Sequence, residues 1–202
     1  MTSSSRSTAA GTSAKGAAVR GTLRFVEHLS GAEVLQRVLA TLPEKLCASL
    51  HAVQPTDDVP YAQLVSLWEA VDAELRDEHP DWAESAGAFS IESLGLQLYG
   101  GILRKPTPSD FLTQSVSLFR LFYAPGDMTV VQEDPGSAVL RLVGFDPRHA
   151  VFCRRQMGGL GRALELAGGL SPVVRHVRCS LQGDVFCEWE MHWDEKKPPS
   201  GT

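Results

Sequence analysis

Apolar residues recur every three or four positions between residues 30 and 123, the spacing of helices with one buried face. The pattern predicts four helices, over 30–53 with an interruption near Pro43, 58–76, 82–103 and 111–123. The first begins with Ser30 and Glu33 at capping-box spacing, and the second begins after Asp58 with an early proline. The buried stripe of the second helix is predicted to contain Leu64, Leu67, Trp68, Val71 and Leu75.

After Pro125 the apolar period changes from helical to alternating, which indicates strands. Residues 127–133 and 137–144 alternate on either side of a turn at 133–136 and predict a hairpin. A helix then runs from Asp146 to about Ala167. Its glycines, Gly158, Gly159 and Gly161, lack the spacing of a nucleotide-binding fingerprint, so we interpret them as allowing close packing of this helix on the sheet.

A second predicted hairpin closes the chain and turns at Gln182-Gly183-Asp184. Arg178 is expected opposite Glu188 on its outer face. The inner face is expected to be buried beneath the preceding helix. It is predicted to contain Val173, Val177, Cys179 and Leu181 on one strand and Val185, Cys187, Trp189, Met191 and Trp193 on the other.

The cysteines of this hairpin form a candidate metal site. Cys179 and Cys187 lie four residues on either side of Gly183, so the turn places their sulfur atoms directly across from each other. Cys153 lies in the early turns of the preceding helix, where the helix N-terminus favours the thiolate that a metal needs. With His176 the set has three cysteines and one histidine, the ligands of a closed structural zinc site.

The residues alone leave alternatives to this zinc site open. Facing cysteines also form disulfides or pack as small apolar side chains, although the absence of a signal peptide favours a reducing cytoplasm. In an ideal hairpin His176 faces away from Cys179, so it joins the cluster only if a bulge or strand start occurs at Val177. His149, four residues before Cys153 and on the same helix face, is the competing fourth ligand.

Composition and charge narrow the classes of partner. The 202 residues are 43% hydrophobic and 21% charged, with a net charge of -5, which gives no reason to expect nucleic acid or an anionic membrane as a partner. No apolar run approaches the ~18 residues of a membrane span. The segments 1–19 and 194–202 are predicted to be disordered tails because they offer little to bury, which leaves a single domain over 20–193.

The metal spacing also carries a family resemblance. The pattern His-x2-Cys-x7-Cys, with a further Cys 26 residues before the middle one, resembles the zinc site of two related groups over roughly residues 80–193. These are the 4-vinyl reductase-like sensory domains of phenol-responsive regulators and the haem–nitric oxide/oxygen binding (H-NOX) proteins. The resemblance implies zinc held by Cys153, His176, Cys179 and Cys187. Vinyl reductase-like sensors usually have a carboxylate at the position of His176, whereas zinc-containing H-NOX proteins have His.

The order of helices followed by strand–strand–helix–strand–strand is shared by these groups and by TRAPP-type domains. It implies an α+β fold, in the order α-α-α-α-β-β-α-β-β, with N-terminal helices packed with a four-stranded antiparallel sheet around an apolar cavity. The chain also resembles an uncharacterised family associated with myxobacterial genomes, and that similarity implies no chemistry.

The vinyl reductase-like resemblance implies a cytoplasmic, non-enzymatic, zinc-containing sensor or adaptor that binds a small apolar ligand. A regulatory partner protein would receive its signal, and a homodimer is left open. Glycines in the predicted helix 82–103 cost helix stability, which is consistent with ligand access there. The candidate lining residues are Trp68, Tyr99, Phe111 and Phe119.

A haem gas sensor of the H-NOX type is the alternative function. Against it, no histidine occurs between His79 and His149, where that family has its haem-ligating histidine. The family's Tyr-x-Ser-x-Arg motif is also absent, because residues 142–148 read LVGFDPR. The chain is predicted not to be an enzyme, since no catalytic triad, open metal site or paired carboxylate in an apolar setting stands out, and an enzyme without readable motifs is the remaining alternative.

Overall fold

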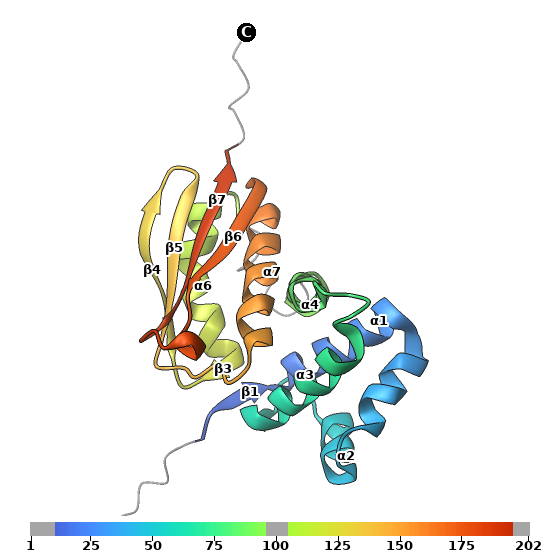
Figure 1. Ribbon diagram of the computed structural model, residues 1–202. Helices are drawn as coiled ribbons and strands as arrows, with labels where there is room; N and C mark the ends of the chain where they lie inside the picture. The colour runs from blue at the N-terminus through green and yellow to red at the C-terminus, as the bar shows by residue number, and fades with distance from the viewer. Residues whose placement is uncertain (1–10, 96–104, 196–202) are drawn as a thin grey trace, which may run out of the picture.

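The computed structural model describes residues 11–95 and 105–195, which form a helical part beside a sheet (Figure 1). The helical part contains α1 (Gly16–Ala40), α2 (Glu44–Ala52), α3 (Tyr61–Leu75) and α4 (Trp82–Ser90), with a π-helical turn at Ile91–Gly95. The sheet part contains α6 (Pro108–Phe122), β4 (Asp127–Asp134), β5 (Ser137–Val143), α7 (Ala150–Leu166), β6 (Leu170–Arg178) and β7 (Cys187–Asp194). The predicted α+β fold class is confirmed.

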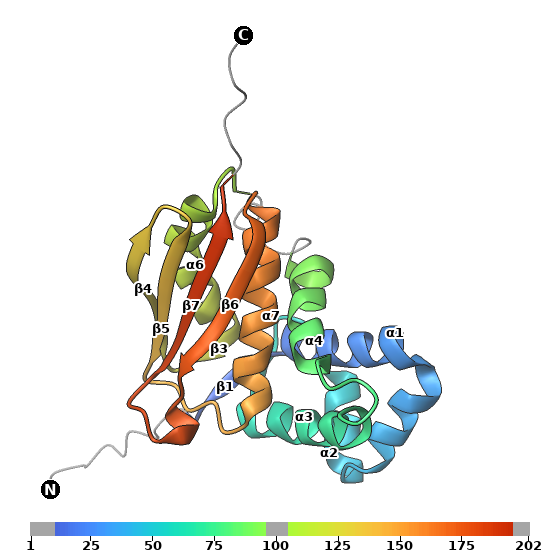
Figure 2. The same ribbon diagram turned by 45° about the horizontal axis from the view of Figure 1, so that its top comes forward.

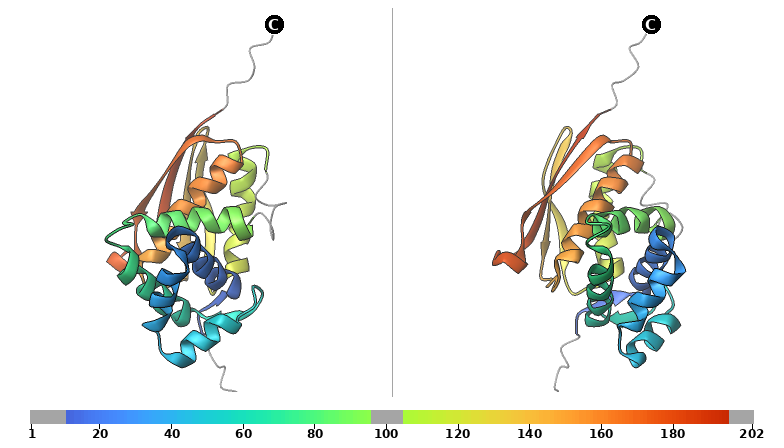
Figure 3. Two further views of the ribbon diagram at one scale, coloured as in Figure 1. Left: turned by 90° about the vertical axis from the view of Figure 1, so that its right-hand side faces the viewer. Right: turned by 45° about the vertical axis from the view of Figure 1, so that its right-hand side comes forward.

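The four long strands form one antiparallel sheet in the order β4-β5-β7-β6. Figure 3 shows this sheet close to edge-on, with the helices on one side of it. α6 and α7 lie against that side, and α4 runs along α7 on the side away from the sheet (Figure 2). Helix α7 is therefore the layer that joins the sheet to the helical part.

Tyr61, the first residue of α3, connects the core of the two parts. Its ring makes edge contacts with Trp68, Tyr123 and Phe145, at centroid distances of 5.9, 6.1 and 5.0 Å. Its hydroxyl donates a hydrogen bond to the Pro147 carbonyl oxygen at 2.8 Å. Burial raises the pKa of Tyr61, so the hydroxyl stays protonated and remains a donor. One continuous core therefore runs from α3 to the sheet.

The predicted N-terminal tail 1–19 is wrong from residue 13 onward. Ser13–Lys15 forms strand β1, which pairs with β2 (Asp58–Pro60) and β3 (Tyr123–Ala124) in a second, three-stranded sheet. Residues 1–10 lie outside the described residues. The segment folds because its small side chains let backbones approach closely: the amide of Gly16 donates to the Asp57 carbonyl oxygen at 2.8 Å. A prediction of disorder from amino-acid composition misses such backbone contacts, because they bury little apolar area per residue.

Two helix starts also differ from the prediction. α1 begins at Gly16 rather than Ser30, and the predicted start survives as a kink where Gly31 has φ of 86°. Asp58 to Pro60 form β2 instead of the first turn of a helix, so α3 begins at Tyr61. At Asp58–Pro60 the pairing with β1, which sequence periodicity does not report, takes precedence over the local capping signal.

Several predicted elements are confirmed. All five residues of the predicted stripe on α3 are buried. The α6 helix, the β4–β5 hairpin and α7 have close to their predicted bounds. The helix predicted over 82–103 is described as α4 and the π-helical turn, and its remainder lies outside the described residues. None of the helices within 11–95 and 105–195 combines the length and apolar character needed to cross a bilayer.

The final hairpin has a register different from an ideal one before Val177. Arg178 pairs with Glu188 as predicted, but His176 pairs with Trp189, so Val177 is an extra residue in β6. Such a bulge reverses the faces of all residues before it. The inward orientation predicted for Val173 and Val177 is therefore wrong, and both are exposed. Leu181 and Val185 are also exposed, contrary to the prediction, because they lie in the connection between β6 and β7 and not in paired strands. The buried set includes Cys179, Cys187, Trp189, Met191 and Trp193, as predicted.

Gly158 in α7 allows close packing on α4 rather than on the sheet as predicted, whereas Gly161 does face β6 of the sheet. A Cβ atom at Gly158 would overlap the backbone carbonyl of Glu84, and one at Gly87 would overlap that of Arg155. The two helices therefore approach backbone to backbone. Gly161 differs, since its Cβ would lie 3.8 Å from a methyl group of Val174, an ordinary contact.

Substitution of these glycines should separate packing from helix propensity. Gly158→Ala should lower the free energy of unfolding by about 1 to 3 kcal/mol, because α4 and α7 must move apart. Gly161→Ala in the same helix should raise it by up to about 1 kcal/mol, because alanine favours the helix. Urea denaturation measures both changes, and equal effects would contradict the close contact at Gly158.

Candidate metal centre

Four side chains meet at the end of the sheet where α7 begins. Cys153 lies in the first turns of α7, His176 near the end of β6, Cys179 just after β6, and Cys187 at the start of β7. One potential ligand atom from each lies within 4.8 Å of all the others. These are the four residues that the sequence predicts, so the chain brings together a three-cysteine, one-histidine cluster able to hold a metal ion.

The bulge at Val177 places His176 in this cluster. His176 pairs with Trp189, and residues paired across antiparallel strands project from the same face. Trp189 is fully buried, so His176 also points toward α7. The His176 ring stacks on the Trp189 ring at a centroid distance of 5.0 Å and an interplanar angle of 19°. The register shift that removes Val177 from the core is therefore the one that supplies the fourth ligand.

The distances within the cluster suit tetrahedral coordination. The sulfur atoms of Cys153 and Cys187 are 3.9 Å apart. Two thiolates at ~2.3 Å from one zinc ion in tetrahedral geometry lie about 3.8 Å from each other. All four cysteines of the described chain have free sulfurs, and the separation is nearly twice the ~2.0 Å of a disulfide bond. The geometry of Cys153 and Cys187 is thus that of two ligands of one ion.

The thiols differ in their readiness to ionise. The hydrogen bond from Cys153, with further bonds from His176 and Ser180, lowers the pKa of Cys187 to about 4. The same contact with Cys187, together with burial, raises the pKa of Cys153. Ionisation is therefore favoured at Cys187, whereas Cys153 tends to keep its proton. A cation between the two sulfurs would displace that proton, because metal binding requires the deprotonated form.

The imidazole of His176 has an unsatisfied nitrogen. Its Nε2 atom is buried and has no hydrogen-bond partner among the described residues. A buried polar atom without a partner costs roughly 1 to 3 kcal/mol, and a metal ion would satisfy it. This orphaned nitrogen beside three buried sulfurs is an observation that fits a metal ligand.

Two residues that the sequence reasoning missed position the ligands. The Asp184 carboxylate accepts a hydrogen bond from the Cys179 amide at 2.8 Å. The Ser180 amide donates to the Cys187 sulfur at 3.5 Å, and the Ser180 hydroxyl lies 3.3 Å from the same sulfur. Ser180 begins the 3-10 turn Ser180–Gln182, which ends at Gly183 with φ of 98°, and Asp184 directly follows that glycine. A Ser directly after one cysteine and an Asp five residues after it were the available signal.

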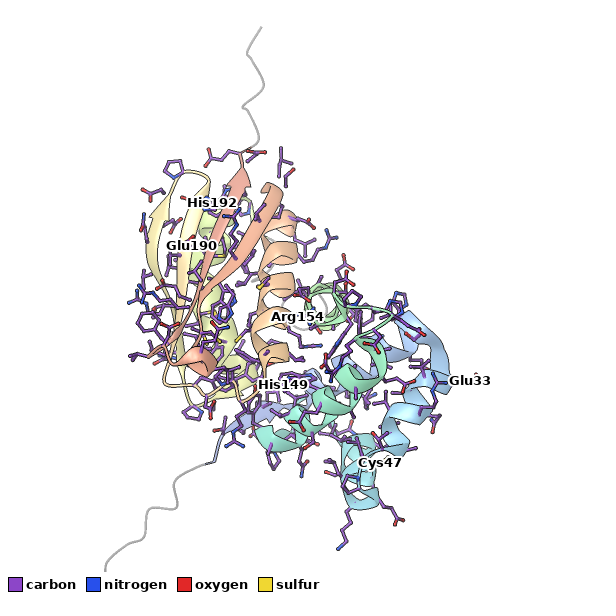
Figure 4. All side chains as sticks on the ribbon, viewed as in Figure 1. Glu33, Cys47, His149, Arg154, Glu190 and His192 are labelled. Atoms are coloured by element: carbon purple, nitrogen blue, oxygen red, sulfur yellow. The ribbon has the colours of Figure 1, made fainter. Side chains whose placement is uncertain are left out.

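The competing ligand His149 has another role. It is the N-cap of α7, and its Nδ1 accepts a hydrogen bond from the Val151 amide at 3.2 Å. Figure 4 shows His149 at the start of α7 and Cys47 on α2, on the far side of the helical part from the sheet. Cys47 contacts His51, with Sγ 3.5 Å from Nδ1. Neither His149 nor Cys47 belongs to the cluster.

The predicted ligand-lining residues lie in the core of the helical part and α6. Trp68 is fully buried and donates from Nε1 to the Thr22 hydroxyl at 3.1 Å. Phe119 packs on Tyr123 at 5.5 Å, and Tyr123 contacts Tyr61, so Trp68 and Phe119 belong to one aromatic cluster. Phe111 is buried in the same core. Tyr99 lies outside the described residues, and a lining role for any of the four stays a prediction.

Comparison with solved structures finds this arrangement of elements in H-NOX domains. The H-NOX protein from S. oneidensis in its Fe(II)NO state is 15% identical and matches 90% of this chain and 99% of its own length, with a TM-score of 0.69. The unliganded Fe(II) H-NOX protein from K. algicida is 12% identical and matches 90% and 97%, also with a TM-score of 0.69. No protein-family model and no curated protein matches the chain. At these identities the similarity shows the fold alone, and the chain has the fold of H-NOX domains.

Proposed function

We propose that this protein is a ligand-binding sensor or adaptor domain in which a structural zinc ion fastens the sheet to α7. The observation that carries the proposal is the cluster of Cys153, His176, Cys179 and Cys187, whose ligand atoms lie within 4.8 Å of one another. Soft thiolates and imidazole in a tetrahedral arrangement favour Zn²⁺ over Mg²⁺ or Ca²⁺. Zinc in this position would join one helix and two strands through a single centre.

The role of this zinc would be structural rather than catalytic. Four protein ligands complete a tetrahedral zinc site and leave no position for water or a substrate. Three of the ligands, Cys153, Cys179 and Cys187, are buried. We therefore propose no enzymatic activity for the centre. Its contribution would be to hold α7, the layer between sheet and helices, at a fixed position.

The sensor role rests on the fold. Several solved structures with this fold are H-NOX proteins described in Fe(II) or Fe(II)NO states, and another is described by the distortion of its haem. In this chain we propose that a small apolar ligand binds in the helical part, near the aromatic cluster that contains Trp68 and Phe119. A conformational change there would reach the sheet through α7, which contacts both α4 and β6.

Haem binding is the second candidate function, and the shared fold favours it. The residues of this chain fit haem poorly. All six histidines lie within the described residues, and none of them is buried. His28 stacks on Phe89, His51 contacts Cys47, and His149 caps α7. His176 is held by the metal cluster. A histidine-ligated haem therefore lacks an obvious axial ligand, and we derive no mechanism through it.

The zinc proposal predicts one tightly bound zinc ion per chain. Zinc in a structural site contributes on the order of 10 kcal/mol to folding, so its removal should lower the melting temperature by more than about 10 °C. Native mass spectrometry and elemental analysis of anaerobically purified protein give the stoichiometry. Less than about a tenth of an equivalent of zinc would contradict the proposal.

A matched pair of histidine variants tests which imidazole binds the metal. His176→Ala should lose most of the zinc, because it removes one of four ligands. His149→Ala should retain one equivalent and lose only about 1 kcal/mol of stability, because it removes a helix cap. Zinc content after dialysis against a chelator measures both, and the opposite pattern would make His149 the ligand.

Haem is tested by titration of the reduced, zinc-loaded protein with haemin, followed by its Soret absorbance. We expect no saturable one-to-one shift, because none of the histidines lies buried in the helical part. A stoichiometric shift that a single substitution abolishes would instead support the second candidate and identify the axial ligand.

A further inference from the structure

Arg155 occupies a position on α7 where the helix otherwise presents apolar side chains to the core. It follows Val151 by four residues and Phe152 by three, and both neighbours are buried. Arg155 itself is only 7% exposed. A cation in a buried stripe conflicts with the helix pattern, and such conflicts are most often found at functional sites.

The guanidinium of Arg155 has few partners. Its Nη2 donates to the Ser90 hydroxyl at 2.9 Å, and its central carbon lies 5.5 Å from the centre of the Trp68 ring. Its Nη1 is buried and has no hydrogen-bond partner among the residues that the structure describes. No carboxylate of the described residues forms an ion pair with it. Arg155 is thus a buried cation with no counter-ion from the described chain.

Arg154, the residue directly before Arg155, is an arginine with a carboxylate partner. Arg154 donates from Nε and Nη2 to the two carboxylate oxygens of Glu84, at 2.8 and 2.6 Å. Figure 4 shows Arg154 on α7 facing the helical part. Arg154 is partly exposed, whereas Arg155 is buried and unpaired, so the more costly of the two charges is the one without an anion.

The surroundings of Arg155 suit a ligand with a charged end and an apolar body. Ser90 is the last residue of α4 and directly precedes the π-helical turn at Ile91–Gly95, a type of distortion frequently found at functional sites. The Trp68 ring lies beside the guanidinium, and Trp68 contacts Tyr61, which in turn contacts Tyr123. Burial without a counter-ion lowers the pKa of Arg155, although an arginine remains protonated at neutral pH.

We propose that Arg155, with Ser90, binds the carboxylate of an apolar carboxylic acid seated in the helical part. One guanidinium neutralises one negative charge, so a monoanion fits better than a phosphate, whose second charge would be buried unpaired. The rings of Trp68 and its neighbours would contact the apolar body. This inference rests on the proposed ligand-binding function and names its ligand class, which covers both fatty acids and aryl-alkanoic acids.

The test compares acids with the alcohols of the same carbon skeleton. Zinc-loaded protein is titrated with decanoate and decan-1-ol, and with 3-phenylpropanoate and 3-phenylpropan-1-ol, using calorimetry or Trp fluorescence. At least one acid should bind about tenfold or more tightly than its alcohol, because its charge-assisted hydrogen bonds to the guanidinium have no equivalent in the alcohol. The pair that shows the preference distinguishes an aliphatic from an aromatic ligand.

Two variants locate the preference. Arg155→Met should abolish the acid-over-alcohol ratio, and it should leave the melting temperature of the ligand-free protein unchanged or higher, because it removes an unpaired buried charge. Arg154→Met, one residue away and paired with Glu84, should keep the ratio. The wild-type comparison needs no variant, so it decides the matter even if Arg155→Met does not fold.

Three results would overturn the inference. Equal binding of acid and alcohol would leave an apolar ligand site but remove the anion from it. The absence of binding by either acid would remove the site itself, and a ratio that survives Arg155→Met would assign the anion to another residue. Zinc content measured on the same samples is independent of all three, so the zinc proposal can fail or stand separately.

Discussion

The structure depends on the junction between the start of α7 and the β6–β7 connection. Three sulfur atoms and one imidazole converge there from elements separated by up to 34 residues of sequence. Without a cation the junction holds a buried Cys187 sulfur whose surroundings favour ionisation, and an unsatisfied nitrogen on His176. Both are costly in a core, and one divalent ion would satisfy both. Because α7 also packs backbone to backbone on α4, the position of this helix couples the junction to the helical part.

A single extra residue in β6 decides the composition of the junction. Without the bulge at Val177, His176 would face away from α7 and Val177 would take an inward position. With it, the imidazole enters the cluster and stacks on Trp189. The sequence showed that His176 needs a bulge at Val177 to join the cluster, since Cys179 and Cys187 fix the register near the turn. Periodicity alone could not predict whether the bulge forms, because a bulge disrupts hydrogen bonds between the strands and is stabilised by a tertiary contact.

The same contrast applies to the rest of the fold. The hairpin around 133–136 and the stripe on α3 follow from local pattern, and both are present as predicted. The β1 strand was missed because small residues such as Ala14 contribute through close backbone approach, and helix–helix contact at Gly158 was assigned to the wrong partner for the same reason. The sequence analysis did not identify Arg155 as a candidate site residue, although an arginine on the apolar stripe of a helix indicates one.

X-ray absorption at the zinc edge of the purified protein tests the central claim most directly, because it reports the ligands around the metal rather than its presence. The account predicts a four-coordinate shell with three sulfur atoms at ~2.3 Å and one nitrogen at about 2.0 to 2.1 Å. A shell dominated by nitrogen or oxygen, or a protein without zinc whose Cys153 and Cys187 form a disulfide, would contradict it.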